Sequence, residues 1–287
     1  MYKNQLPDHL SHSQITTYLQ CPLKYRYQYV DRIPWPFVPD YLTFGTAIHK
    51  AIESFYRSRQ KGREAHLDDL CEVFSETLLF DAASRELKLK KEADPTSLQK
   101  QGEAMLKVFE ESVQPSEVIA VEEEFEIELV EDDSGEAICL RLKGRVDLVE
   151  RTEEGELEFV DFKTASKSPS EDAIKTDMQL TAYSLYARCN YMVNGDPVKM
   201  RLDVLKKTKT PCFASYPTYR TCEDSQRYIK IIRQIRSAME GGHFYPNPGW
   251  QCGDCPFRSN CPVKSIDSPK GCVVNDALNC KELAIQH

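Results

Sequence analysis

The feature that most restricts the fold of this chain is a two-residue period of apolar side chains between residues 125 and 163. Such alternation is typical of β-strands with one buried face. Two polar, glycine-containing stretches, Asp132-Asp133-Ser134-Gly135 and Glu153-Glu154-Gly155, interrupt it as turns would. The pattern therefore predicts three consecutive strands joined by turns, in the runs 125–129, 138–148 and 157–163.

Helical signals lie on both sides of these strands. Ser11 or Ser13 can cap a first helix, and Pro22 can begin a second one. We expect helices at 14–20, 22–29, 42–59, 67–84, 96–113, 171–191 and 223–239, and two more strands at 198–204 and 213–216. The central order of helix, three strands, helix and strand predicts a mixed α/β (α+β) fold.

Charge and length leave several classes of partner open. The net charge of −8 over 287 residues argues against nucleic acid, but the charge is unevenly spread. Between 199 and 209 there is one acidic residue against five basic ones, Lys199, Arg201, Lys206, Lys207 and Lys209. No apolar run approaches the roughly 20 residues of a membrane helix, and the first residues do not resemble a signal peptide. We therefore expect a cytoplasmic protein that does not enter a membrane.

Two aspartates and a lysine are the strongest candidates for a chemical site. Asp161 and Lys163 are two residues apart on a strand, so they project from the same face. Folding the hairpin at Glu154 brings Asp147 close to Asp161, where two carboxylates repel each other. A divalent cation such as Mg²⁺ or Mn²⁺ would offset that repulsion, bind a phosphate and activate a water, with Lys163 acting on the water or on the phosphate. The alternative is a hairpin whose charges are simply solvated.

Three cysteines near the C-terminus have the spacing of metal ligands. Cys252 and Cys255 are separated by two residues, and Cys261 follows after five more. The chain has 11 cysteines, and in a reducing compartment such a spacing favours metal binding over disulfides. Three thiolates need a fourth ligand to complete a tetrathiolate site, which could hold an iron–sulfur cluster or zinc. Unrelated core thiols are the remaining alternative.

Five short motifs in order resemble the RecB-like branch of the PD-(D/E)XK nucleases. They are Ser13-Gln14-Ile15 with Cys21-Pro22-Leu23-Lys24-Tyr25, Phe44-Gly45-Thr46-Ala47-Ile48-His49, Gly144-Arg145-Val146-Asp147, Val160-Asp161-Phe162-Lys163-Thr164 and Gln179-Leu180-Thr181-Ala182-Tyr183. The resemblance implies a restriction-endonuclease-like core with a central mixed sheet flanked by helices. It also implies an N-terminal cysteine-bearing helical segment (1–41), a helical region (42–116), the nuclease core (117–240) and a C-terminal iron–sulfur-binding tail (241–287), all in one compact unit.

The resemblance assigns roles to further residues. His49 would join Asp147, Asp161 and the backbone carbonyl of Phe162 around the metal. The alternative for His49 is a hydrogen bond to Glu53 one helical turn later. Gln179 and Tyr183 share a helix face and would support the active site or touch the DNA backbone, unless they form an ordinary polar stripe. Glu122 matches a common family position without a role that we can assign.

The resemblance also supplies a fourth cysteine ligand and a reaction. Cys21 would join Cys252, Cys255 and Cys261 around a 4Fe–4S cluster, with Cys272 or Cys280 as substitutes. The implied activity is metal-dependent hydrolysis of DNA, by an exonuclease acting on single strands or DNA ends. Family members act beside a separate helicase or with CRISPR adaptation proteins, and this chain has no Gly-x-x-x-x-Gly-Lys-Ser/Thr phosphate loop of its own. The alternatives are a non-catalytic module that binds DNA ends and a zinc-containing interaction scaffold.

Overall fold

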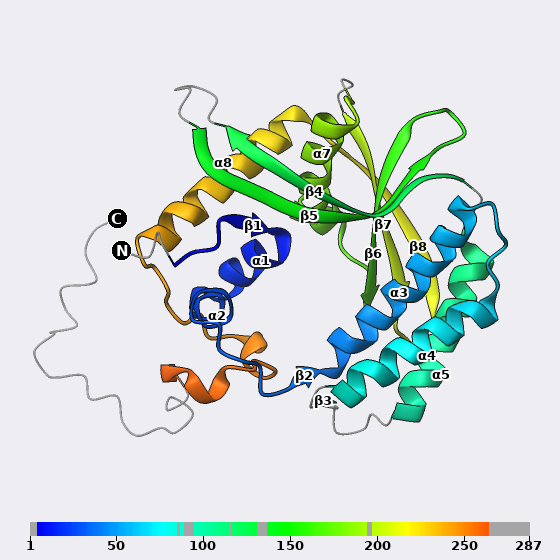
Figure 1. The fold of residues 1–287 in the computed structure, drawn as a ribbon, viewed down its shortest axis with the longest axis horizontal. Helices are drawn as coiled ribbons and strands as arrows, with labels where there is room; N and C mark the ends of the chain where they lie inside the picture. The colour runs from blue at the N-terminus through cyan, green and yellow to red at the C-terminus, as the bar shows by residue number, and fades with distance from the viewer. Residues whose placement is uncertain are drawn as a thin grey trace, which may run out of the picture.

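A mixed six-stranded sheet forms the centre of the computed structural model, which describes residues 5–84, 87–88, 95–114, 116–130, 137–193 and 197–263 (Figure 1). Its strands are β1 (His9–Ser11), β4 (Glu117–Val130), β5 (Ala137–Arg151), β6 (Leu157–Ala165), β7 (Val198–Lys206) and β8 (Cys212–Arg220). The order is β1-β5-β6-β7-β8, with β4 also paired to β5. β1 is parallel to β5 and β6 is parallel to β7, whereas the other pairs are antiparallel. The three consecutive strands are confirmed, and the turn expected at 132–135 lies outside the described residues.

Helices cover both faces of this sheet, as the mixed α/β fold class requires. They are α1 (His12–Gln20), α2 (Pro22–Tyr25), α3 (Asp40–Gln60), α4 (Leu67–Ser84), α5 (Pro95–Ser112), α6 (Glu171–Lys175), α7 (Met178–Asn190) and α8 (Cys222–Glu240). A π-helical turn at Arg26–Val30 continues α2, and the short strands β2 (Val38–Pro39) and β3 (Leu87–Lys88) pair with each other. No helix in the described part of the chain is long and apolar enough to span a bilayer.

The alternation of the strands divides the interior into two cores. Helices α1, α7 and α8 pack on one face of the sheet, where Val146 and Phe159 are buried. Helices α3, α4 and α5 pack on the other face, where Val160 and Phe162 are buried. Successive residues of β6 therefore contribute to opposite cores, since strand side chains alternate. This places Asp161 on the α7 side and leaves Phe162 on the α3 side.

The expected helix over 171–191 is wrong in one respect, because it breaks at Thr176. Asp177 caps α7 instead, with Oδ1 accepting from the backbone N–H of Gln179 and of Leu180. A buried arginine on β8, Arg220, donates to the carbonyls of Ile174 and Asp177 and fixes the bend. The apolar pattern continues through the bend and so did not reveal it.

The segment around α2 and the segment that follows α8 lie side by side (Figure 1). Tyr18 donates to the carbonyl of His243 at 2.9 Å, and the amide of Leu23 donates to the carbonyl of Tyr245 at 3.0 Å. The hydroxyl of Tyr27 reaches the carbonyl of Asn260. The segment that contains Cys21 is thereby held against the segment that contains the other three clustered cysteines.

Candidate functional site

The β5–β6 hairpin places Asp147 and Asp161 where the two strands separate. The last pair in the ladder is Leu148 with Val160, and the same register puts Asp147 opposite Asp161. The Asp147 carboxylate reaches across to β6, where its Oδ2 accepts from the backbone N–H of Phe162 at 2.8 Å. Asp161 has no exposed surface. The expected juxtaposition of the two aspartates is confirmed.

Lys163 is held between a carboxylate and an amide. Its Nζ lies 3.0 and 2.8 Å from Asp161 Oδ1 and Oδ2, and it donates to Gln179 Oε1 at 2.7 Å. Burial lowers the pKa of Lys163, but the Asp161 charge and hydrogen bond outweigh it, so the pKa is raised above its ordinary value. The ammonium is therefore charged at neutral pH. The side chain is 40% exposed, so it can also reach a bound substrate.

Helix α7 supports this arrangement through Gln179 and Tyr183. Gln179 Nε2 donates to the Tyr183 hydroxyl at 2.9 Å. That hydroxyl lies 2.8 Å from the carbonyl of Arg145 and 3.2 Å from Asp161 Oδ1. Burial, followed by the charges of Asp147 and Asp161, raises the pKa of Tyr183 well above its ordinary value. Tyr183 thus remains a neutral donor beside the carboxylates, and both α7 residues line the site.

A candidate cation site lies beside the hairpin, on the α3 side of Asp147. His49 of α3, Glu122 of β4 and Asp147 each offer a ligand atom, and these atoms all lie within 4.8 Å of one another. His49 Nδ1 is 3.7 Å from Asp147 Oδ2. The alternative partner of His49, Glu53, instead pairs with Lys50 and Arg57. Within the described residues no other group of three such side chains comes together as closely.

Glu122 joins this group through an unusual backbone conformation. Its φ of +50° lies in the left-handed region that non-glycine residues seldom adopt, and Glu122 is absent from the β4–β5 ladder, where Val121 and Glu123 pair with Leu148 and Val146. Its carboxylate is 2.6 Å from Arg145 Nε. Strain of this kind collects at functional positions. No local signal in the sequence distinguishes Glu122 from the acidic residues that follow it.

The electrostatics of this group fit a divalent cation. Burial, and then the charge of Asp161, raises the pKa of Asp147 well above its ordinary value. Burial likewise raises the pKa of Glu122 and lowers the pKa of His49. Each shift reflects the cost of holding a charge in a desolvated site. A hard cation with oxygen and imidazole ligands would offset that cost.

The five basic residues between 199 and 209 do not form one group. Lys199 lies 3.8 Å from Glu158, and the guanidinium of Arg201 is surrounded by Glu150, Glu158 and Asp203. At the other end of β7, Lys206 donates to Ser168 Oγ, the Lys207 ammonium lies 3.7 Å from the centre of the Phe44 ring, and Lys209 is exposed. Only this second group lies near the end of β6 that carries Lys163.

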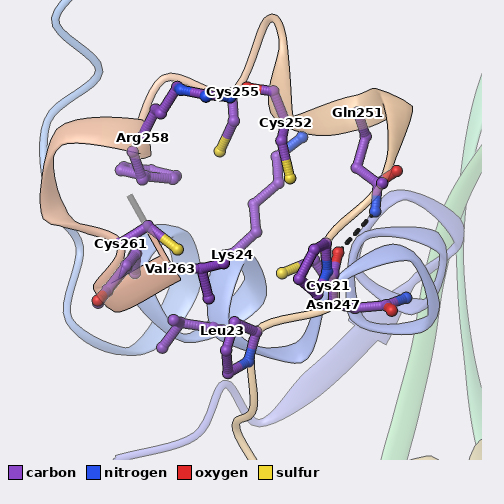
Figure 2. A pocket seen from close by; sticks show the side chains of 15 residues that line it. Cys21, Leu23, Lys24, Asn247, Gln251, Cys252, Cys255, Arg258, Cys261 and Val263 are labelled. Atoms are coloured by element: carbon purple, nitrogen blue, oxygen red, sulfur yellow. Dashed lines mark hydrogen bonds between the residues drawn. The ribbon is translucent and has the colours of Figure 1, made fainter. Parts of the chain in front are cut away.

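The four candidate cluster ligands line one cavity of about 230 Å³. Figure 2 shows the sulfur atoms of Cys21, Cys252, Cys255 and Cys261 directed into the same space. Two cationic side chains, Lys24 and Arg258, line it as well. Cys272 and Cys280 lie outside the described residues.

Comparison with known proteins identifies the family of this chain. The family model described as the PD-(D/E)XK nuclease superfamily matches residues 9–262. No curated protein matches the chain significantly. Among solved structures, SSO0001 is 15% identical, covering 90% of this chain and 88% of its own with a TM-score of 0.42. A candidate exonuclease from Eubacterium rectale is 13% identical, covering 98% of this chain and 94% of its own with a TM-score of 0.48. Since the family model spans the whole described sheet and both candidate sites, this chain belongs to the PD-(D/E)XK nuclease superfamily.

Proposed function

We propose that this chain is a DNA exonuclease of the RecB-like branch that requires Mg²⁺ or Mn²⁺. The observation that carries the proposal is the convergence of His49, Glu122 and Asp147 beside the ion pair of the buried Asp161 and Lys163. His49, Asp147 and Asp161 would hold the metal, with Glu122 and the carbonyl of Phe162 as further ligands. When bound, the metal supplies charge for a scissile phosphate and acidity for a water.

The side chains around the metal ligands have separate tasks in this proposal. Lys163 is held by Asp161 and Gln179 and presents a fixed positive charge to the water or to the phosphate. Gln179 orients Lys163, and Tyr183 links Gln179 to Asp161 and to the β5 backbone. Because these groups are placed before the substrate arrives, little reorganisation is needed during the reaction.

We further propose that Cys21, Cys252, Cys255 and Cys261 hold a 4Fe–4S cluster. The resemblance to the iron–sulfur members of the family favours the cluster, and the four cysteines line a single cavity of about 230 Å³. A zinc ion held by the same four thiolates is the alternative. Lys24 and Arg258 would balance part of the negative charge of the thiolates.

For substrate contacts, we propose Lys206, Lys207 and Lys209. Lys206 ends β7, and Lys207 and Lys209 follow it, at the end of the sheet toward which β6 runs past Lys163. They can therefore bind phosphates that flank the cleaved bond. Lys199 and Arg201 are less suited to this role, because neighbouring carboxylates already bind them.

The test is cleavage of end-labelled DNA by anaerobically purified protein, with linear and circular single- and double-stranded substrates compared. We expect degradation of linear DNA that depends on Mg²⁺ or Mn²⁺, with circular DNA spared. Asp161→Ala should remove cleavage while leaving a folded protein. Cutting of circular DNA would exclude an exonuclease. DNA binding without cleavage in any metal would instead support the non-catalytic, end-binding alternative.

A further inference from the structure

Two neighbouring strands of the sheet, β4 and β5, both depart from regular alternation. In β5, Val146 is buried in the core on the α7 side, whereas Leu148 is buried in the core on the α3 side. Side chains two residues apart on a regular strand share a face, so the alternation of β5 breaks at Asp147. In β4, Val121 lies in the α3-side core and Phe125 in the α7-side core. Regular alternation would place both on one face, so β4 breaks between them.

The break in β4 falls at Glu122. The next residue, Glu123, accepts a hydrogen bond from the hydroxyl of Tyr191 at 2.5 Å. The Tyr191 ring packs on Phe159 of the α7-side core, with ring centres 5.5 Å apart. Glu123 is therefore already on the α7 side, in phase with Phe125. Glu122, whose φ is +50°, is the position at which the strand changes face.

The register of the ladder places this break opposite the one in β5. Glu123 pairs with Val146 in the antiparallel ladder, so the preceding residue, Glu122, lies opposite Asp147. Both residues belong to the candidate cation group, together with His49. The side chain of Glu122 is 7% exposed, so its carboxylate is held inside the molecule at this point. The geometry of the group therefore depends on where β4 changes face.

The hydrogen bond at Glu123 can offset the cost of that change. Left-handed backbone is strained for a residue other than glycine, and it persists only where the surroundings impose it. A hydrogen bond to a charged group contributes a comparable free energy. Tyr191 is fixed in place to donate it, because its ring packs edge-on against Phe159 and Tyr186. Tyr186 also makes a side-chain hydrogen bond with Glu123.

We propose that Tyr191, together with Tyr186, is a positioning residue for Glu122. By holding Glu123 on the α7 side, the two hydroxyls fix the point at which β4 changes face and keep the Glu122 carboxylate beside Asp147. Without them, β4 can return to regular alternation, which turns Glu122 away from the group. The inference rests on the proposed function, in which Glu122 is a further ligand of the metal.

Substitutions that remove only hydroxyl groups test whether the tyrosines support metal binding. The double variant Tyr186→Phe/Tyr191→Phe keeps both rings. Tyr228→Phe is the matched control, because Tyr228 is buried on α8 and its hydroxyl makes no hydrogen bond within the described part of the chain. Calorimetry should show a Kd for Mn²⁺ about tenfold higher in the double variant, the value of one hydrogen bond to a charged group. The control should bind Mn²⁺ as the wild type does.

A comparison at position 122 tests the backbone without any metal. Glycine adopts left-handed backbone more readily than alanine. Glu122→Gly should therefore be more stable than Glu122→Ala, by about fivefold in the folding equilibrium constant measured with urea in EDTA. In the Tyr186→Phe/Tyr191→Phe background this preference should vanish or reverse, because regular strand backbone favours alanine. A merely structural role of the tyrosines would lower the stability of both variants equally and leave the preference intact.

Three results would overturn the inference. These are an unchanged Kd for Mn²⁺ in the double variant, no preference for glycine in the otherwise wild-type chain, and an equal preference in both backgrounds. If circular dichroism shows that the double variant is unfolded, Tyr191→Phe alone takes its place in both tests. Wild-type protein that binds no Mn²⁺ would overturn the proposed function. The comparison of glycine with alanine, made without metal, would still decide whether the tyrosines position Glu122.

Discussion

The backbone amide of Phe162 donates a hydrogen bond to the side chain of Asp147 on the neighbouring strand. This bond replaces the next rung of the β5–β6 ladder, which ends at Leu148 and Val160. It turns the Asp147 carboxylate toward β6, beside Asp161, and close to His49. The hairpin therefore holds the buried carboxylates of Asp147 and Asp161 close together before any cation is present.

That proximity predicts a pH-dependent stability for the metal-free protein. The pKa of Asp147 is raised in the folded state, so the folded chain holds this proton more tightly than the unfolded chain. The fold therefore loses stability as pH rises from the unfolded pKa of about 3.9 through the folded pKa. Asp147→Asn avoids this loss and should be more stable by on the order of 1–3 kcal/mol at neutral pH. Urea denaturation in EDTA should show the gain fading as pH falls, and a constant gain at all pH values would refute the titration of Asp147 as its cause.

Lys163→Met should separate catalysis from metal binding. The lysine is not a metal ligand in the proposed site, so Mn²⁺ affinity measured by calorimetry should persist while single-turnover cleavage falls about a hundredfold. Gln179→Ala should lose less, since Gln179 acts through Lys163. The exposed Lys167, two residues beyond the end of β6, provides the control, and Lys167→Met should cleave normally. Loss of Mn²⁺ binding in Lys163→Met would assign the lysine to the metal site instead.

The cysteine cavity predicts a coloured protein. Anaerobically purified wild type should be brown, absorb at about 400 nm and contain about four irons per chain. Cys252→Ser should lose iron and colour. Cys189→Ser should keep both, because Cys189 lies on α7 and does not line the cavity. Stoichiometric zinc without iron in the anaerobic wild type would show that the cavity holds a different site.

The lysines beyond β7 should govern the salt dependence of DNA binding. Lys206→Glu combined with Lys207→Glu should weaken binding to all DNA sequences and reduce the slope of log K against log[salt] by about 1.4 or more, for two phosphate contacts on single strands. Lys230→Glu, on the exposed surface of α8, should leave the slope nearly unchanged. Equal slopes in the double variant and the wild type would show that these lysines do not bind DNA phosphates.

Arg220 should contribute strongly to the stability of the fold, although it is not one of the proposed site residues. It is fully buried and donates to Thr181, Thr218 and three backbone carbonyls. Arg220→Met removes all of these hydrogen bonds and should cost about 3 kcal/mol of unfolding free energy in urea. Arg227→Met, on the exposed side of α8, should change it by less than about 1 kcal/mol. Similar costs for the two variants would contradict the role assigned to burial.

The sequence predicted the elements of this fold well because its periodicities are strong. The alternation that marks β5 and β6 also fixes Asp161 and Lys163 on one face, and a turn near Glu154 sets the register that brings Asp147 opposite. The helix α4 was predicted with its observed bounds, Leu67–Ser84. Each of these features depends on residues that are close in sequence, where local rules apply.

Features that depend on distant residues escaped prediction. Arg201 looks like a phosphate ligand in a basic segment, yet Glu150 and Glu158 from two other strands enclose it. Glu122 matches a family position in the sequence, but its place beside His49 and Asp147 depends on a backbone conformation that no local pattern predicts.

Helix α1 begins at His12 and is capped at its other end by Cys21. Nine helical residues span about 14 Å, so this helix connects the candidate cluster ligand Cys21 to the β1–β5 pair, where Ser11 lies beside Lys143. Along its length α1 packs against α7, the helix that carries Gln179 and Tyr183 of the proposed active site. Oxidative loss of the cluster would displace α1 and, through α7, disturb these two residues, so the nuclease rate would fall on exposure to air before the sheet unfolds.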